Sequence, residues 1–447
     1  MTTRLADLRS CFEGAVPSAF ATCDPDGTPN VAYLSQVHFV DDEHVALTYQ
    51  FFNTTRQNIL ANPRGVVQIV DPDTAAHFRL HLEYLRTETE GPLFEKMKAK
   101  LAGIASHTGM SKVFRLRGSD VYRVVRIEHV FGEPAADASH TQRMLSSLRA
   151  GLVDLARCDD LARLFNEALQ GLDKHFDIRH AMLLMHDERR NRLYAVASRG
   201  YPASGVGSEI GFGEGIVGVA ARERTAIRIS YAASEYLYGR VARAGFEQSG
   251  VDALETEIPF PGLQNSNSQL AVPLTRGRRL LGVLYVESPQ ARRFSYEDED
   301  ALEVFAGQLA LSIQLLSDAA EPPDEPPAVA GPPAPVRGTP VAIRHFAADH
   351  SVFVDNEYLI KGVAGAILRK LIGDYVDAGR TEFTNCELRR DPSLGLPDIT
   401  DNLEARLILL QRRLAERHAF LAIEKTGRGR FRLSVSRPLR LTDAPGR

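Results

Sequence analysis

Eight of the chain's 24 prolines lie between Glu321 and Pro340, in the sequence EPPDEPPAVAGPPAPVRGTP. Proline cannot continue a helix or donate to a central strand, and this stretch has no bulky apolar residue that could anchor it to a core. Residues 319–340 are therefore expected to form an extended linker, which separates residues 341–437 from the rest of the 447-residue chain.

A second boundary lies where the spacing of apolar residues changes. Gly132-Glu133-Pro134 ends a segment with the pattern of β-strands. From Thr141 onward apolar residues recur at helical spacing, at Met144, Leu145, Leu148, Leu152 and Leu155. The chain is therefore expected to be a multidomain α+β protein with modules at residues 1–135, 140–318 and 341–437.

Composition narrows the class of protein further. Hydrophobic residues make up 44% of the chain and charged residues 25%, as in ordinary globular proteins. The formal net charge of -4 excludes a globally basic nucleic-acid coat, although it leaves room for a local basic face. No run approaches the ~18–20 apolar residues of a membrane helix, and no signal peptide is evident, so a cytoplasmic protein without membrane contact is expected.

The cysteines exclude two further kinds of site. The four cysteines lie far apart and never form a CxxC pair, at Cys11, Cys23, Cys158 and Cys386. Neither a disulfide framework nor a metal site is predicted from this spacing. No Ser/His/Asp order or paired-carboxylate motif is evident either, so no catalytic residue is predicted.

The first module has the pattern of a β-barrel with short helices. Residues 17–50 are expected to form three strands of an antiparallel meander, joined by acidic turns at 24–27 and 41–43. A polar loop and a short helix ending at Asn62-Pro63 follow, then a buried strand, a further strand, a helix from Gly91 to about Ser106 and a closing strand. These strands are expected to close into a β-barrel whose connections contain short helices.

The strand end Thr48-Tyr49-Gln50 and the following segment from Asn53 to Asn58 resemble the pyridoxamine 5'-phosphate oxidase-like split barrels that bind flavin mononucleotide (FMN). The resemblance covers roughly residues 10–130. It implies that FMN is bound by Tyr33, Ser35, Gln36, Tyr49, Gln50, Thr55 and Arg56. A guanidinium, hydroxyl donors and the N–H groups of a helix start suit a phosphate. Thr55 stands where the family often has a second basic residue, and a surface helix capped by Arg56 and Asn58 is the alternative.

The second module has the order helix, sheet, helix. Its last helix is expected to begin with a capping box between Ser295 and Asp298. Four segments in sequence resemble a GAF domain, an α/β sensor fold: Phe212-Gly213-Glu214-Gly215-Ile216-Val217-Gly218, Leu270-Ala271-Val272-Pro273-Leu274, Leu281-Gly282-Val283-Leu284 and Phe294-Ser295.

The GAF resemblance implies a small-molecule pocket over the sheet, bordered by Arg199, Tyr201, Phe212 and the long insertion from Tyr231 to Asn267, or a module used for dimerisation alone. The ligand is left open. The last helix has one apolar flank with Leu302, Phe305, Leu309 and Leu316, and another with Val304, Leu311 and Leu315. Because a helix that is apolar on two sides packs against two surfaces, a homodimer is expected.

The third module ends in three helices and a basic hairpin. In the helix expected after its N-cap Asp401, a leucine stripe faces the core, and an adjoining flank carries Asn402, Arg406 and Arg413. These three side chains are predicted to enter the DNA major groove. The hairpin cations Lys425, Arg428, Arg430 and Arg432 are predicted to contact phosphates. This order resembles the winged helix-turn-helix of OmpR-type response regulators over about residues 350–435, apart from the linker SLGLPDIT before the DNA-reading helix.

Three functions remain open from the sequence. The first is a cytoplasmic one-component transcriptional regulator that senses a flavin, redox or small-molecule signal and binds double-stranded DNA. The alternative is an FMN-dependent oxidoreductase with regulatory GAF and winged-helix domains. The third is a protein whose two sensor folds have lost their ligands. A basic helix and hairpin favour the regulator, because an enzyme has little use for them.

Overall fold

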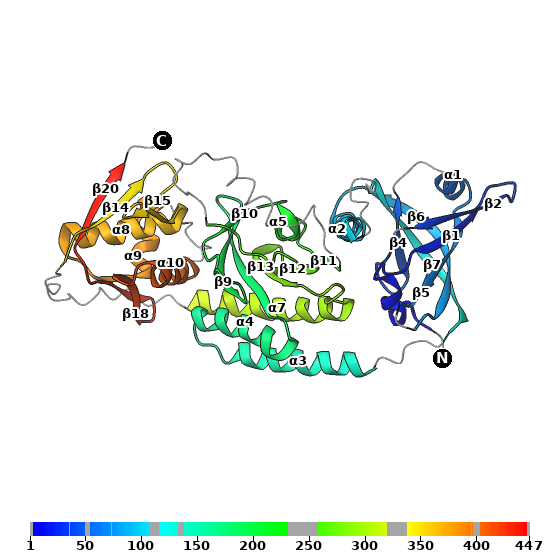
Figure 1. Ribbon diagram of the computed structural model, residues 1–447, viewed down its shortest axis with the longest axis horizontal. Helices are drawn as coiled ribbons and strands as arrows, with labels where there is room; N and C mark the ends of the chain where they lie inside the picture. The colour runs from blue at the N-terminus through cyan, green and yellow to red at the C-terminus, as the bar shows by residue number, and fades with distance from the viewer. Residues whose placement is uncertain are drawn as a thin grey trace.

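The computed structural model describes residues 3–34, 36–49, 54–72, 74–107, 116–132, 138–230, 258–319, 338–394, 396 and 403–444. Figure 1 shows three parts in a row, with the central domain between an N-terminal barrel and a C-terminal module. Within these residues no helix has both the length and the hydropathy needed to cross a membrane.

Seven strands of the N-terminal domain form one antiparallel sheet, in the order β2-β1-β5-β6-β7-β4-β3. The strands are β1 (Ser18–Cys23), β2 (Pro29–Leu34), β3 (Val37–Phe39), β4 (His44–Tyr49), β5 (Arg64–Val70), β6 (His77–Glu88) and β7 (Gly118–Phe131). A 3-10 helix, η1 (Leu5–Phe12), precedes them, and the connections contain α1 (Thr54–Ala61) and α2 (Pro92–His107).

The two edge strands of this sheet are neighbours in the chain, which requires the sheet to curl. β2 ends at Leu34 and β3 begins at Val37, yet they lie at opposite edges. Strands are ~4.8 Å apart, so this short connection cannot cross a flat seven-stranded sheet, and the sheet rolls into a partial barrel. The predicted meander is wrong, because residues 29–39 form two strands that pair at opposite edges.

The sheet has an apolar core on its inner face and helix α2 on part of its outer face. Phe20, Leu47 and Tyr122 are buried inside the barrel. Met97 and Leu101 of α2 pack against the outer face, in a cluster with Ala46 and Val121. Since side chains alternate along a strand, Leu47 and its neighbours lie on opposite faces, and both faces near the end of β4 are shielded from solvent.

The central domain has a six-stranded antiparallel sheet with helices on both faces, in the order β10-β9-β8-β13-β12-β11. The strands are β8 (His180–Asp187), β9 (Arg192–Arg199), β10 (Glu209–Gly211), β11 (Ile227–Ile229), β12 (Ser268–Arg276) and β13 (Arg279–Ser288). One face packs against α3 (Ala138–Ala156), α4 (Leu161–Phe176) and α7 (Tyr296–Ala319), and the other against α5 (Gly215–Glu223).

The start and the two apolar flanks of α7 follow the sequence. The Ser295 N–H donates to Asp298 Oδ2 at 2.9 Å, and the Asp298 N–H donates to Ser295 Oγ at 3.3 Å, so the predicted capping box is confirmed. One flank is buried in the domain, at Leu302, Phe305 and Leu309, and the other is exposed, at Val304, Leu311 and Leu315. The homodimer expected from the second flank stays a prediction.

The C-terminal module has two small sheets, β16-β15-β14-β20 and β17-β19-β18. Its strands are β14 (Val341–Phe346), β15 (Ser351–Val354), β16 (Glu357–Ile360), β17 (Glu382–Thr384), β18 (Leu421–Gly427), β19 (Arg430–Val435) and β20 (Leu439–Ala444). Its helices are α8 (Gly362–Ala378), α9 (Asn385–Arg390), the 3-10 turn η2 (Pro392–Leu394) and α10 (Leu403–Arg417). β20 pairs in parallel with β14, so the module extends beyond the predicted end at residue 437.

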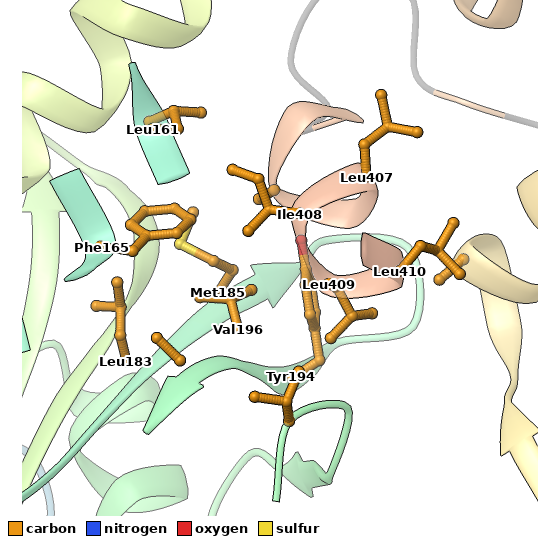
Figure 2. Packing of buried hydrophobic residues seen from close by; sticks show 14 of the residues in the cluster. Leu161, Phe165, Leu183, Met185, Tyr194, Val196, Leu407, Ile408, Leu409 and Leu410 are labelled. Atoms are coloured by element: carbon orange, nitrogen blue, oxygen red, sulfur yellow. The ribbon is translucent and has the colours of Figure 1, made fainter. Parts of the chain in front are cut away.

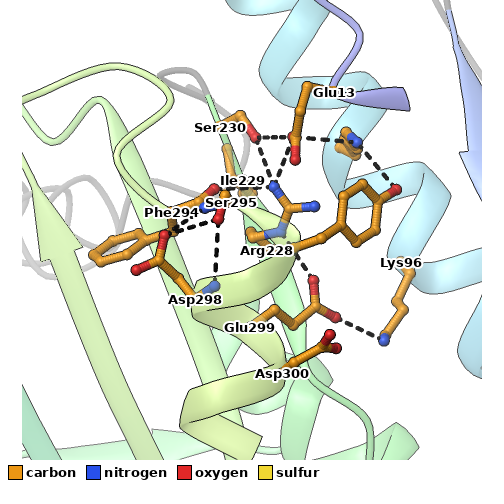
Figure 3. A network of polar contacts seen from close by, with 12 residues as sticks. Glu13, Lys96, Arg228, Ile229, Ser230, Phe294, Ser295, Asp298, Glu299 and Asp300 are labelled. Carbon is orange, nitrogen blue, oxygen red and sulfur yellow. Dashed lines mark hydrogen bonds and ion pairs between the residues drawn. The ribbon is translucent and has the colours of Figure 1, made fainter. Parts of the chain in front are cut away.

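Buried charged side chains join the barrel to the central domain (Figure 3). Arg228 of β11 donates from Nη1 to Glu13 Oε2 at 2.7 Å and from Nε to Glu299 Oε2 at 2.9 Å. On the barrel side, Lys96 Nζ donates to Glu299 Oε1 at 2.9 Å, and Lys100 Nζ lies 3.7 Å from Glu13 Oε2. We call these five residues the ionic seam.

The cations of the ionic seam hold its two carboxyl groups in the ionised state. Burial alone would raise the pKa of the Glu299 carboxyl, but Lys96 and Arg228 lower it by more, so this pKa lies well below its ordinary value. The pKa of Glu13 is also lowered, by Arg228 and Lys100 against the effect of burial. Both carboxylates are therefore buried as anions, which is tolerable only while their cations remain.

Candidate functional site

Arg56 lies in the first turn of α1, at the end of the barrel. Its Nη1 donates to Asp120 Oδ1 at 2.5 Å, and its Nη2 donates to Thr87 Oγ1 at 2.8 Å. The guanidinium also lies 4.6 Å from the centre of the Tyr49 ring. Burial raises the pKa of Asp120, although Thr87 and Arg56 oppose the shift. Arg56 is thus fixed in place, with its charge balanced by a carboxylate that an incoming anion has to compete with.

Three polar side chains form a row across neighbouring strands at the same end of the barrel. Thr48 of β4 is paired with Ser119 of β7, and the Thr48 N–H donates to the Gln36 carbonyl at 3.4 Å. All three side chains are buried, Gln36 to 1% exposure and Ser119 to 0%. Neither amide atom of Gln36 nor either hydroxyl has a hydrogen-bond partner in the part of the chain that the structure describes. We call these residues the polar row.

Buried polar atoms without a partner are costly and uncommon in native proteins. A bound molecule with both donors and acceptors would satisfy the polar row. Thr48 follows Leu47, whose side chain lies in the inner core, so the row faces the outer side of the sheet, whereas Asp120 and Arg56 lie on the inner side. A ligand that contacts both groups has to pass around the end of β4.

The structure separates the residues that were predicted to bind FMN. Tyr49 and Arg56 lie together, and Gln36 lies on the other face of the sheet end. Thr55 Oγ1 accepts from Asn30 Nδ2 at 2.9 Å, and Tyr33 on the edge strand β2 is 84% exposed. Ser35 and Gln50 lie outside the described residues. The sequence did not single out Thr48, Ser119 and Asp120 as site residues. The signal that could have indicated them is their position as polar residues at the ends of two strands.

The predicted GAF pocket is only partly brought together. Tyr201 and Phe212 pack against the apolar core on the α5 face of the sheet. Arg199 instead donates from Nη2 to Asp173 Oδ2 of α4 at 2.7 Å, on the other face. Arg199 therefore forms an ion pair at the surface and does not line a pocket with the two aromatic residues.

A polar cluster lies next to Tyr201 on the α5 face, and the sequence did not indicate it. Glu287 of β13 is 2% exposed and pairs with Gln269 of β12. The Leu263 N–H donates to Glu287 Oε1 at 3.1 Å, and Gln269 Nε2 donates to Ser266 Oγ at 3.1 Å. Burial raises the pKa of Glu287, and burial together with the Glu287 charge raises the pKa of Tyr201. This cluster is where a small molecule with a donor group could be recognised.

The prediction that Arg406 and Arg413 face outward is wrong. Arg406 is 5% exposed, and its Nη1 lies 3.4 Å from Asp187 Oδ2 of the central domain. Arg413 is 4% exposed, and its Nε donates to the Leu359 carbonyl at 3.3 Å. The physical reason is that other elements cover this flank of α10: the central domain covers Arg406, and β16 of the same module bonds Arg413. Asn402 lies outside the described residues.

Lys425, Arg430 and Arg432 lie on the two strands of the hairpin and Arg428 lies in its turn, and their contact with phosphates stays a prediction. Lys425, Arg428 and Arg432 are exposed and Arg430 is half-buried. On β19 the side chains of Phe431 and Leu433 face the core, so the arginines beside them share the outer side. Arg432 Nε donates to Glu382 Oε1 at 2.5 Å.

Comparisons with known proteins identify two of the three parts. The family model for pyridoxamine 5'-phosphate oxidase matches residues 6–128, and that for the GAF domain matches residues 158–314. None of the curated proteins matches the chain.

Parts of the chain are also similar to solved structures. The chain is similar to a GAF domain of an Acinetobacter phosphoenolpyruvate-protein phosphotransferase, with 23% identity, a TM-score of 0.31, and coverage of 40% of this chain and 97% of that one. It is similar to an FMN-binding protein from Syntrophomonas wolfei, with 20% identity, a TM-score of 0.24, and coverage of 28% and 86%. The chain thus contains a pyridoxamine 5'-phosphate oxidase family domain followed by a GAF domain.

Proposed function

We propose that the chain is a flavin-binding regulator of transcription. FMN would bind in the barrel, a small molecule would bind at the Glu287 cluster, and the C-terminal module would contact duplex DNA. The polar row carries the cofactor part of the proposal, because its buried atoms have no partner among the described residues and the domain matches a flavin-enzyme family. A homodimer through the exposed flank of α7 completes the proposal.

The end of β4 fits the two chemically different ends of FMN. A phosphate suits the Arg56 guanidinium and the first-turn N–H groups of α1. The edge of a flavin ring has both donors and acceptors, which suit Gln36 and the hydroxyls of Thr48 and Ser119. When bound, FMN would supply a redox-active ring. Asp120 would oppose the phosphate, because it already occupies one side of Arg56.

Arg56→Ala is expected to weaken FMN binding by about ten- to a hundred-fold, because a charge-assisted hydrogen bond contributes ~1.5–3 kcal/mol. Titration of the full chain with FMN and with riboflavin, followed by flavin absorbance and fluorescence, measures this. Riboflavin has no phosphate, so its affinity should not change.

Asp120→Asn is the matched variant for this prediction. It removes the competing carboxylate but keeps a side chain of the same size, so FMN should bind more tightly while riboflavin binds as before. Equal losses for both flavins in Arg56→Ala would show that Arg56 acts on the fold rather than on the phosphate.

Two features support DNA as the target of the C-terminal module. Its order of helix α8, strand β17, helices α9 and α10 and hairpin β18–β19 is compatible with the winged helix expected from the sequence. The hairpin also presents Lys425, Arg428 and Arg432 to solvent, as a contact with phosphates requires.

Arg428→Ala in the full chain is expected to lower DNA affinity equally for all sequences and to reduce the salt slope by about one, because one phosphate contact is lost. Gel shifts on a library of duplexes at two salt concentrations measure both effects. Arg440→Ala is the matched control, since Arg440 is an exposed arginine of the same module on β20, away from the hairpin.

A flavin-dependent oxidoreductase is the second candidate, and the match to pyridoxamine 5'-phosphate oxidase favours it. FMN binding without any salt-dependent DNA binding would support the enzyme. DNA binding that responds to the redox state of FMN would support the regulator.

A further inference from the structure

Helix α10 is apolar on two sides, and each side has its own partner. Leu403, Leu407, Leu410 and Leu414 form the stripe predicted to face the core of the C-terminal module. Ile408 and Leu409 lie on the other side, 7% and 3% exposed. Figure 2 shows these two side chains directed toward a surface of the GAF domain formed by Phe165, Met185, Tyr194 and Val196. A helix that is apolar on two sides packs against two surfaces.

Polar contacts at the rim of this interface fix the position of the helix. Arg412 Nη1 donates to the Val196 carbonyl of β9 at 2.6 Å, and Arg412 Nη2 donates to Asn166 Oδ1 of α4 at 2.6 Å. Arg406 pairs with Asp187 at 3.4 Å, with both side chains 6% exposed, and lies 5.3 Å from the centre of the Tyr194 ring. Each arginine thus binds a group that only the GAF domain supplies.

The residue before α8 adds a second contact between the same two domains. Lys361 Nζ lies 3.8 Å from Glu209 Oε2 of β10, and Arg190 Nη1 donates to the other oxygen of Glu209 at 2.7 Å. The C-terminal module is therefore held at two places by strands of the GAF sheet. Two domains joined only by the proline-rich linker would form neither of these contacts.

We infer that the GAF domain is the partner that α10 is built to bind, and that the GAF domain and duplex DNA compete for this one helix. Docking of α10 on the GAF domain is independent of the proposed function, whereas competition with DNA rests on it. While α10 is docked, Arg406 is engaged with Asp187 and Ile408 is covered, so the helix cannot enter a groove. Separation of the two domains is therefore a condition for DNA contact by α10.

Strand β9 gives the GAF domain a means of controlling this contact. Tyr194 and Val196 face α10, while Leu193 and Ala195 face the core on the α5 side, near which the Glu287 cluster lies. A ligand that shifts β9 on one face alters the docking surface on the other. Lys425, Arg428 and Arg432 stay exposed in the docked form, so weak phosphate contact does not require release of α10.

The first experiment tests docking without DNA. A protease site is introduced after Ala328 of the full chain, the linker is cleaved, and size-exclusion chromatography shows whether the two fragments elute together. They are expected to stay together. Asn166→Arg should make them separate, because it sets a cation against Arg412 on an exposed position of α4. Gln290→Arg adds the same charge to another exposed position of the GAF domain and should leave them associated.

The second experiment tests competition with the uncleaved chain. Asn166→Arg should bind duplex DNA about ten-fold more tightly than the parent, since a charge-assisted hydrogen bond no longer holds α10 down, and Gln290→Arg should match the parent. Fragments of the parent that separate after cleavage overturn docking. Separation by Asn166→Arg with unchanged DNA affinity overturns competition. If neither the parent nor any variant binds DNA at low salt, the proposed function fails. Docking is then still decided by the first experiment alone.

Discussion

Arg228→Met is expected to lower the free energy of unfolding of the barrel and GAF domain by about 3–5 kcal/mol, because it leaves two buried carboxylates without their shared cation. Glu13 and Glu299 both accept hydrogen bonds from Arg228, and they are 7% and 8% exposed. Methionine fills a similar volume without a charge. Urea unfolding of the variant and parent at neutral pH measures the difference.

Lys100→Met is the matched control at the same seam. Burial is the main cause that lowers the pKa of Lys100 from 10.5 to about 8, so the folded protein holds this proton less tightly than the unfolded chain. Stability of the parent is therefore expected to rise as the pH increases from about 8 toward 10.5, and the variant should lack this rise. Arg228 still neutralises Glu13 in this variant. The free energy of unfolding of Lys100→Met at neutral pH should therefore be only a little lower than that of the parent. An equal loss in both variants would contradict the central role of Arg228.

Gly282→Ala is expected to destabilise the GAF domain by about 3 kcal/mol or more, because the added carbon has no space in the sheet. A Cβ at Gly282 would lie 2.0 Å from the carbonyl oxygen of Leu184 and 3.0 Å from its carbon. Both atoms belong to the backbone of β8, so the strands themselves have to move apart. Thermal unfolding followed by circular dichroism measures the loss.

Gly171→Ala is the control for this variant within the same domain. Gly171 lies inside helix α4, and a Cβ there would meet only His175 Cδ2 at an ordinary distance of 3.9 Å. Alanine should stabilise the helix by about 0.5–1 kcal/mol. A Gly282→Ala protein as stable as the parent would mean that the strands accommodate the methyl group without cost.

Local features of the fold could be predicted from the sequence because they depend on residues close together in the chain. The capping box of Ser295 and Asp298 is an example, and the basic hairpin, in which Gly427 pairs with Arg430, is another. Motif order was also sufficient for the first two domains, whose resemblances are confirmed by family models. The winged helix has no such match and stays a prediction.

Long-range placement could not be predicted, because the sequence does not say which distant surface a side chain meets. The pairing of β2 and β3 at opposite edges depends on the curl of the whole sheet. The leucine stripe of α10 by itself predicts a solvent-facing flank for Arg406. Ile408 and Leu409 were the signal that a second surface covers the helix. The polar row likewise depends on strand register, which brings Thr48 beside Ser119.

The parallel pairing of β20 with β14 has a consequence for the order in which the protein is made. β14 is the first strand of its module and β20 the last, and Val341 is matched with Leu439. During synthesis this edge of β14 stays unpaired until residues 439–444 have left the ribosome. An open edge can pair with other chains. The nascent protein can therefore complete its barrel and GAF domain well before this sheet, and the C-terminal module closes last.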